Sequence, residues 1–210
     1  MKTKLNQKQL WEDLAKKNAR YYINSDKGKG ITEEEFRASG EQDVKELILN
    51  DTAIMLEGAI LEIGCGNGRM TEFIAPHFDQ VIGVDISGEM IRQGVERLKG
   101  IDNIYLFETD GESFPVPDDT MDVVFSYIVF QHFKTKEMVE KNFKEAYRVL
   151  RPGGLFKVRL RTDEIASLEP WWSGVNYSEE EIKALCSVSH LKMVELEYVK
   201  SYAVWLWARK

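Results

Sequence analysis

The stretch AILEIGCGNG, residues 59–68, decides the fold of this 210-residue chain. An apolar run leads into a turn with glycines at 64, 66 and 68, and Glu62 stands just before that turn. A second apolar run, residues 81–84, ends at Asp85. Glycines let the backbone turn sharply and approach a ligand closely, because no Cβ intrudes. This order is typical of an α/β sheet that binds a nucleoside: a strand, a glycine turn, a helix, a second strand and a terminal acid. The terminal acid, Asp85, can accept hydrogen bonds from both ribose hydroxyls.

The spacing of the glycines distinguishes two kinds of cofactor. A dinucleotide fingerprint reads G-x-G-x-x-G and seats a pyrophosphate on the N-terminus of the following helix. Here Arg69 stands where that fingerprint requires its third glycine. The pattern E-x-G-x-G-x-G, residues 62–68, resembles the first motif of class I S-adenosylmethionine-dependent methyltransferases. Their cofactor contains a nucleoside and no phosphate.

Three further segments extend the resemblance in order and spacing from about residue 58 to residue 160. Asp110-Gly111-Glu112 follows the apolar residues 104–107, where the family places an acid near the adenine amino group. Residues 121–126 resemble the family's fourth strand, and residues 148–154 resemble the turn before its fifth strand. The chain is most similar to the small-molecule, type 11/25-like branch, which includes ubiquinone-pathway-type enzymes.

The resemblance implies S-adenosyl-L-methionine as cofactor and S-adenosyl-L-homocysteine as product. Asp85 is expected at the ribose, Glu62 at the methionyl end, Asp110 at the adenine amino group, and the Ser126 carbonyl at the ammonium group. Arg69 could bind the cofactor carboxylate or simply pair with Glu62. The full set of expected cofactor-binding residues is Glu62, Gly64, Cys65, Gly66, Gly68, Arg69, Asp85, Ile86, Met90, Asp110, Gly111, Glu112 and Ser126.

Several members of that set also have an ordinary structural interpretation. Core packing explains Ile86 and Met90 almost as well as contact with the adenine. Cys65 can serve as a small residue inside the turn. Asp110-Gly111 is also a common turn dipeptide.

His132 is the candidate general base, because an imidazole titrates near neutral pH. It also follows the fourth strand, and the carboxyl end of that strand faces the reaction. The alternative is a packing residue, since related sequences often carry Gln-His at this place. The acceptor is expected to lie against Tyr22, Trp171 and Trp172, which could stack on a planar or cationic group or could close the core.

Three cations alternate on the expected fifth strand, at Lys157, Arg159 and Arg161. Because alternate residues share a face, all three should need partners in a buried sheet. Glu195 and Glu197 on a later strand could supply them. The alternative assigns Arg159 to an anionic group of the substrate.

Composition is that of an ordinary globular protein, with 43% hydrophobic and 30% charged residues. We expect one domain over 1–210, with a helical cap over 1–50 and an α/β core over 51–210. The net charge of −7 argues against a nucleic-acid partner. Two cysteines suggest neither disulfides nor a metal site. No run is apolar enough for a membrane span or a signal peptide, which predicts a cytoplasmic protein. The oligomeric state is left open.

The periodicity predicts a Rossmann-like, mostly parallel seven-stranded sheet with one antiparallel C-terminal strand, helices on both faces and extra N-terminal helices. Capping boxes are expected at Thr32/Glu35, Ser39/Gln42 and Ser178/Glu181. Strands are expected near 59–63, 80–84, 103–108, 121–126, 154–161, 192–199 and 203–209. Helices are expected near 68–75, 87–98 and 135–150.

The function predicted from these features is methyl transfer to an oxygen, nitrogen or carbon atom, most simply of a small molecule. Marks of several other acceptor classes are missing, including the Asn/Asp-Pro-Pro-aromatic turn of amino-directed nucleic-acid enzymes. Protein or RNA remains an alternative acceptor. A nicotinamide oxidoreductase and a non-catalytic S-adenosylmethionine sensor are the rivals from other classes.

Overall fold

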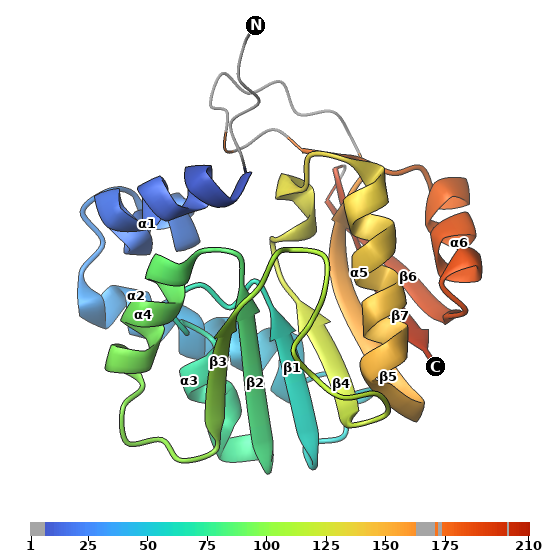
Figure 1. Ribbon diagram of the computed structural model, residues 1–210, viewed down its shortest axis with the longest axis horizontal. Coiled ribbons are helices and arrows are strands. Elements are labelled where there is room, and N and C mark those ends of the chain that lie inside the picture. The colour runs from blue at the N-terminus through green and yellow to red at the C-terminus, as the bar shows by residue number, and fades with distance from the viewer. Residues whose placement is uncertain (1–6, 163–170, 172–173, 201) are drawn as a thin grey trace, which may run out of the picture. The chain divides into compact units, whose positions relative to one another are not determined.

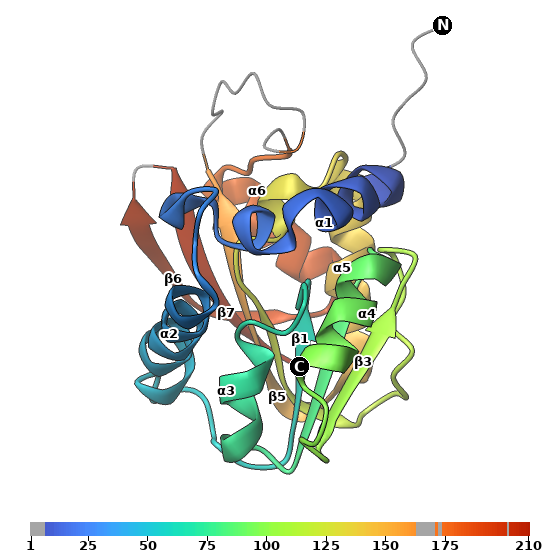
Figure 2. The same ribbon diagram turned by 90° about the vertical axis from the view of Figure 1, so that its left-hand side faces the viewer.

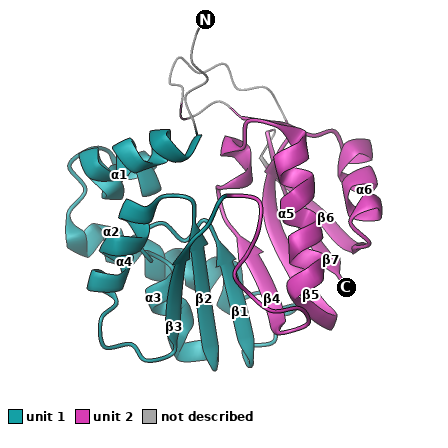
Figure 3. Ribbon diagram, viewed as in Figure 1, with its two compact units in different colours: residues 1–110 teal, residues 111–210 magenta. Residues whose placement is uncertain are grey.

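The computed structural model describes residues 7–162, 171, 174–200 and 202–210. Hydrogen bonds order its strands β3-β2-β1-β4-β5-β7-β6 in one seven-stranded sheet (Figure 1). The chain divides into two compact units, within which most contacts between residues fall (Figure 3). They are unit 1, Met1–Asp110, and unit 2, Gly111–Lys210. The expectation of a single domain stays a prediction.

Unit 1 contains three parallel strands whose residues are almost all apolar. The strands are β1 (Ala59–Ile63), β2 (Gln80–Asp85) and β3 (Ile104–Glu108). In register, Ile63 lies beside Val84, and Asp85 lies beside Glu108. Parallel strands present their carboxyl ends at one edge, so the glycine turn after β1 and Asp85 at the end of β2 meet there.

The helices of unit 1 begin and end close to the expected positions. They are α1 (Gln7–Ile23), η1 (Ser25–Lys27), α2 (Glu33–Val44), η2 (Lys45–Leu49), α3 (Thr71–Ile74), η3 (Ala75–His77) and α4 (Gly88–Arg97). The capping box of Thr32 and Glu35 opens α2 as expected. Figures 1 and 2 show α1 running across the carboxyl ends of the strands of unit 1.

One expected helix start is wrong. Ser39 lies inside α2 rather than opening a new helix, and the helix continues into the π-helical η2. The Ser39 hydroxyl donates to the Phe36 carbonyl at 2.7 Å, which is a bond within α2. Ser39 therefore does not cap the N-terminus of a new helix. Because Gln42 follows in the same continuous helix, the Ser-x-x-Gln spacing carried no information about a boundary.

Unit 2 contains the C-terminal strands, including the antiparallel member. The elements are β4 (Met121–Ser126), η4 (Phe130–His132), α5 (Lys136–Val149), β5 (Leu150–Arg161), α6 (Glu179–Val188), β6 (Lys192–Lys200) and β7 (Ala203–Arg209). Strand β7 pairs antiparallel with both β5 and β6, as the short connection between β6 and β7 requires. The capping box of Ser178 and Glu181 opens α6.

The core of unit 2 is rich in aromatic rings. Phe130, Phe143 and Phe156 are fully buried, and their ring centroids lie 5.0–6.3 Å apart. Offset and edge-on ring contacts at these separations add to the stabilisation that burial alone provides. On α5, Phe143 shares a buried face with Val139 and Ala146.

Candidate cofactor-binding site

The glycine turn of unit 1 is held by backbone hydrogen bonds to the neighbouring strand. The amides of Gly64 and Cys65 both donate to the Val84 carbonyl, at 2.7 and 3.1 Å. Gly66 has φ +56°, in the left-handed region that favours glycine, and a Cβ there would lie 2.9 Å from Ile23 Cδ1. The turn therefore requires glycine at residue 66 for its backbone conformation and for the close approach of α1.

Asp85 is bonded directly to this turn. Its Oδ2 accepts from the Gly66 amide at 3.0 Å, and its Oδ1 accepts from the Ser87 amide at 2.9 Å. Burial raises the pKa of the Asp85 carboxyl to about 6, against the backbone hydrogen bonds, which lower it. The carboxyl is therefore mostly ionised at pH 7. An ionised carboxylate has about four acceptor positions, so one that the backbone amides leave open suits a ribose hydroxyl.

Glu62 lies on β1 beside the same turn and is 5% exposed. Its Oε2 accepts from the Thr71 hydroxyl at 2.6 Å. Burial raises the pKa of Glu62 to about 7, while Thr71 and the charge of Arg69 lower it. Glu62 was expected here from the sequence, whereas Thr71, which opens α3 and holds this carboxyl in place, was not.

The structure gives Arg69 an anionic partner that sequence analysis did not identify. Its Nη1 lies 2.6 Å from Asp43 Oδ2 and donates to the Ser39 hydroxyl at 3.2 Å. The ion pair is therefore with α2, while the charge of Arg69 also lowers the pKa of Glu62, one of the two partners considered for it. Arg69 is 5% exposed, so this pairing supplies the counter-charge that a buried guanidinium needs. Its contact with a cofactor carboxylate stays a prediction.

Helix α1 contributes contacts around the start of α4 that sequence analysis also missed. Glu12 Oε2 accepts from the Ser87 hydroxyl at 2.9 Å and from the Glu89 amide at 3.0 Å. The Glu89 amide has no partner within its own helix, and a carboxylate is stabilising at a helix N-terminus, so Glu12 caps the start of α4. Met90 packs with Ala15 and Ala19, which supports the packing interpretation of Met90.

The remaining candidates of unit 1 have less structural support. Cys65 is buried, its Sγ faces Gly83, and burial raises the pKa of its thiol, so it acts as a small apolar residue. Ile86 is half-buried, and Asp110 is exposed at the end of the unit. Tyr22 makes an edge-on contact with Tyr21 at 4.9 Å.

The expected cofactor residues of unit 2 lie on the segment after residue 110 and at the end of β4. The Gly111 carbonyl accepts from Asn142 Nδ2 at 2.8 Å, and Glu112 pairs with Lys141. Both contacts hold this segment to α5. Ser126 is fully buried as the last residue of β4.

His132 is held through both ring nitrogens. Nδ1 lies 2.8 Å from the Trp171 carbonyl, which can only accept, so Nδ1 carries the proton and Nε2 accepts from the Gln131 amide at 3.3 Å. Burial lowers the pKa of His132 to about 4, and Arg161 and Lys134 lower it further. These contacts favour the packing interpretation, and the role of general base stays a prediction. Of the three aromatic residues expected at the acceptor, two fall in this part of the chain: Trp171 is 9% exposed, and Trp172 lies outside the described residues.

The expected pairing of the β5 cations with Glu195 and Glu197 is wrong, because β7 lies between the two strands. In register, Lys157 faces Trp207 and Arg159 faces Trp205, and the two glutamates lie on the far side of those residues. Lys157 Nζ instead lies 4.9 Å from the ring centroids of both Trp205 and Trp207. Cation–π contact thus occupies the face where ion pairs were expected.

A search of the described residues finds no group of three or more His, Cys, Asp or Glu side chains that could hold a metal ion. Among the helices in the same part of the chain, none has the length and apolar character to cross a membrane.

Comparison with known proteins agrees with this geometry. The family model described as "Methyltransferase domain" matches residues 60–154, the segment that contains the glycine turn and Asp85. Over residues 60–154 the chain is similar to methyltransferase domains. The resemblance to class I S-adenosylmethionine-dependent methyltransferases of the type 11/25 kind is thereby confirmed.

Two curated relatives illustrate the match. The "Uncharacterized methyltransferase YcgJ" of Bacillus subtilis is 30% identical over 126 residues, covering 59% of this chain and 47% of the relative. The malonyl-[acyl-carrier protein] O-methyltransferase of Hahella chejuensis is 33% identical over 120 residues, which cover 56% of this chain and 42% of that relative. The matched regions thus span less than half the length of these relatives.

A solved structure supports the fold of the domain. Haemonchus contortus phosphoethanolamine N-methyltransferase 2, solved in complex with S-adenosyl-L-methionine, aligns with a TM-score of 0.65 at 18% identity. The alignment covers 82% of this chain and 52% of that one.

Proposed function

We propose that this protein transfers a methyl group from S-adenosylmethionine to an oxygen, nitrogen or carbon atom of a small molecule. The observation that carries the proposal is the Asp85 carboxylate bonded to the Gly66 amide, beside a turn with Arg69 at the third position of the dinucleotide fingerprint. This arrangement offers acceptors for a ribose without the glycine pattern that seats a pyrophosphate.

The chain's own residues have positioning roles in this proposal. The cofactor, when bound, supplies a methyl group that is already activated on a sulfonium. Asp85 would hold the ribose, Glu62 would orient the methionyl end, and the glycine turn would allow the backbone to approach. Alignment of donor and acceptor and exclusion of water supply most of the rate enhancement in such a displacement.

The relatives support a small-molecule acceptor in general terms. One is named for malonyl-[acyl-carrier protein], and another, from Rhodopseudomonas palustris, is named a trans-aconitate 2-methyltransferase. A protein or RNA acceptor remains the alternative. A cytoplasmic location also stays a prediction.

Calorimetric titration with S-adenosylhomocysteine tests the cofactor. We expect binding of S-adenosylhomocysteine but not of NADH, and Asp85→Ala should weaken it at least tenfold, because losing a buried acceptor costs about 1–3 kcal/mol. Asp102→Ala, at an exposed aspartate of the same unit, is the control and should bind like wild type. Unchanged affinity in Asp85→Ala would remove this residue from the site.

Turnover separates the enzyme from a non-catalytic sensor. Methyl-labelled S-adenosylmethionine is incubated with the protein and a panel of small acids, amines and phenols, with a protein extract and RNA as further arms. Label transferred to a small molecule supports the proposal. Label found only in protein or RNA would contradict the proposed acceptor, and cofactor binding with no transfer in any arm would identify a sensor.

A further inference from the structure

The side chain of Arg159 on β5 is the feature of unit 2 that most favours a ligand other than the cofactor. The structure places its Cζ 5.5 Å from the ring centroid of Tyr127, and the Tyr127 ring stacks on Trp205 at 5.7 Å with an interplanar angle of 14°. A guanidinium lying over a ring is held by its face, so its N–H donors point outward along its edge.

One of those donors is unsatisfied. Arg159 Nε is buried and has no hydrogen-bond partner among the residues that the structure describes. A buried donor without a partner costs about 1–3 kcal/mol, so a group that accepts from it would be bound favourably. Nε and the adjacent Nη form one of the two edges through which a guanidinium binds a carboxylate with two parallel hydrogen bonds.

Further positive charge gathers around this residue. Arg161, two positions along on the same face of β5, is 3% exposed, and burial together with the charge of Arg159 lowers its pKa. Burial and the charge of Arg161 likewise lower the pKa of Lys134. The charge of Arg161 thus acts on Lys134, and the charge of Arg159 acts on Arg161.

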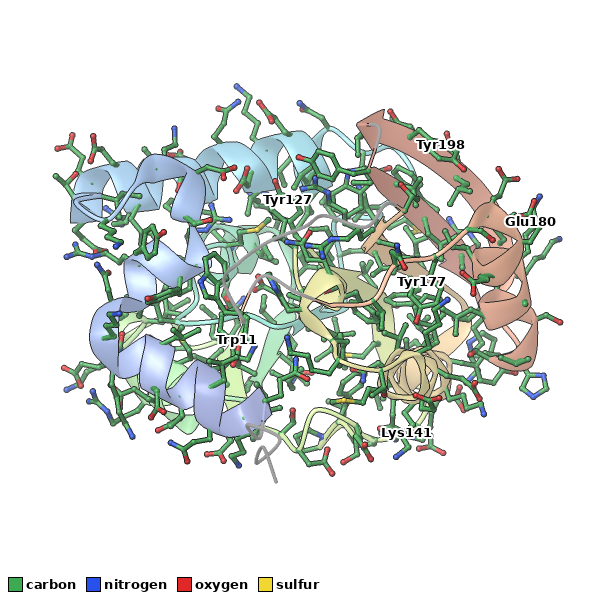
Figure 4. The ribbon with its side chains drawn as sticks, turned by 90° about the horizontal axis from the view of Figure 1, so that it is seen from above. Trp11, Tyr127, Lys141, Tyr177, Glu180 and Tyr198 are labelled. Carbon is green, nitrogen blue, oxygen red and sulfur yellow. The ribbon has the colours of Figure 1, made fainter. Side chains whose placement is uncertain are left out.

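The position of Tyr127 agrees with a ligand site. It follows the last residue of β4, and ligands of open α/β sheets bind outside the carboxyl ends of the strands. Figure 4 looks onto that end and shows Tyr127 away from the rim near α6 and β6, where Glu180 and Tyr198 lie.

We propose that unit 2 binds a small molecule through a carboxylate, held by the Arg159 guanidinium edge with Arg161 and Lys134 as additional positive charge. Identifying this molecule as the methyl acceptor rests on the function proposed above. The guanidinium edge matches the two oxygens of a carboxylate, and the ring beneath Arg159 fixes the plane of that edge.

The test measures binding of simple acids without any methyl transfer. Succinate and benzoate are titrated by calorimetry, each against its matching neutral amide, and inorganic phosphate is a separate arm. The variants are Arg159→Gln and Arg159→Lys, and the control is Arg151→Gln, at an exposed arginine near the other end of β5 that pairs with Asp122. Thermal melting and S-adenosylhomocysteine binding are recorded for every variant.

We expect at least one acid to bind more tightly than its amide and more tightly than phosphate. Arg159→Gln should weaken that binding at least fivefold, Arg159→Lys should keep part of it, and Arg151→Gln should leave it unchanged. Acids that bind no better than amides, tighter binding of phosphate, or equal binding in Arg159→Gln would each overturn the proposal. If the acids fail to bind as expected while S-adenosylhomocysteine still binds, the carboxylate site is wrong and the proposed methyl transfer is unaffected.

Discussion

At the scale of the residue, Glu62 shows how position changes the chemistry of a side chain. An exposed glutamate has a pKa near 4.5, whereas burial on β1 raises the pKa of Glu62 to about 7. The same effect raises the pKa of Asp85 to about 6. The two carboxyls beside the glycine turn therefore change charge in the pH range where most enzymes are assayed.

The raised pKa of Glu62 predicts a pH-dependent stability. Because the folded protein binds this proton more tightly than the unfolded chain, the contribution is complete below pH 4.5 and is lost as pH rises toward and through 7. The shift corresponds to about 3 kcal/mol at 1.36 kcal/mol per pKa unit. Urea unfolding of wild type and Glu62→Gln at several pH values measures the difference.

Glu62→Gln should lose this part of the pH dependence, so the two curves should diverge between pH 4.5 and 7. The control is Glu96→Gln, at an exposed glutamate on α4, which should follow wild type at every pH. Parallel curves for wild type and Glu62→Gln would show that Glu62 titrates normally in the folded protein.

His132 shows which details a sequence pattern leaves undetermined at this scale. The Gln-His pair was visible in the sequence, and both the base and the packing interpretation fitted it. The Trp171 carbonyl and the Gln131 amide, which occupy the two ring nitrogens, could not be inferred. Residue 171 is distant in sequence, and only the fold brings its backbone to this ring.

At the scale of the element, α2 packs unusually close to the segment after the glycine turn. A Cβ on Gly40 would lie 2.2 Å from the carbonyl oxygen of Arg69. The Arg69 side chain in turn reaches Asp43, one helical turn further along α2. A small residue and an acid on one helix face therefore fasten α2 to the start of the first helix after the turn.

This contact predicts that Gly40→Ala changes the free energy of unfolding in the direction opposite to that usual for a helix. Gly→Ala in a helix interior normally stabilises a protein by about 0.5–1 kcal/mol. Gly40→Ala should instead destabilise by about 1–3 kcal/mol, because a backbone carbonyl cannot move aside as a flexible side chain can. Chemical denaturation measures the free energy of unfolding, with Glu41→Ala, exposed on the same helix, as the control. A stabilised Gly40→Ala protein would contradict this packing.

The elements themselves were largely predictable from periodicity and capping chemistry. The expected strands at 59–63, 121–126 and 203–209 agree with the structure at both ends. Boundaries that depend on neighbours were less accurate: β5 begins at Leu150 rather than 154, because Met121 pairs with Leu150 across a register shift. Such pairing is a property of two strands together.

At the scale of the whole molecule, cofactor binding should be linked to global stability. A ligand that binds only the folded state adds about 2.7 kcal/mol at a concentration of 100 times its Kd. We expect S-adenosylhomocysteine at that concentration to raise the melting temperature in scanning calorimetry. If residues 1–210 form one domain, the scan should show a single transition that shifts as a whole.

NADH at the same concentration is the control ligand and should leave the transition in place. A scan with two transitions, of which S-adenosylhomocysteine shifts only one, would contradict the single-domain prediction while keeping the cofactor. No shift with S-adenosylhomocysteine would contradict the cofactor itself.

By itself the sequence determined the α/β fold, the glycine turn, Asp85 and the type of cofactor. These depend on local periodicity, on backbone conformations that favour glycine, and on the spacing of nearby residues. The tertiary structure alone decided that Asp43 neutralises Arg69, that Glu12 caps the start of α4, and that tryptophan rings rather than a glutamate meet Lys157 on β5. These contacts join residues far apart in the chain, and strand order and helix packing, rather than sequence distance, set which charges and rings become neighbours.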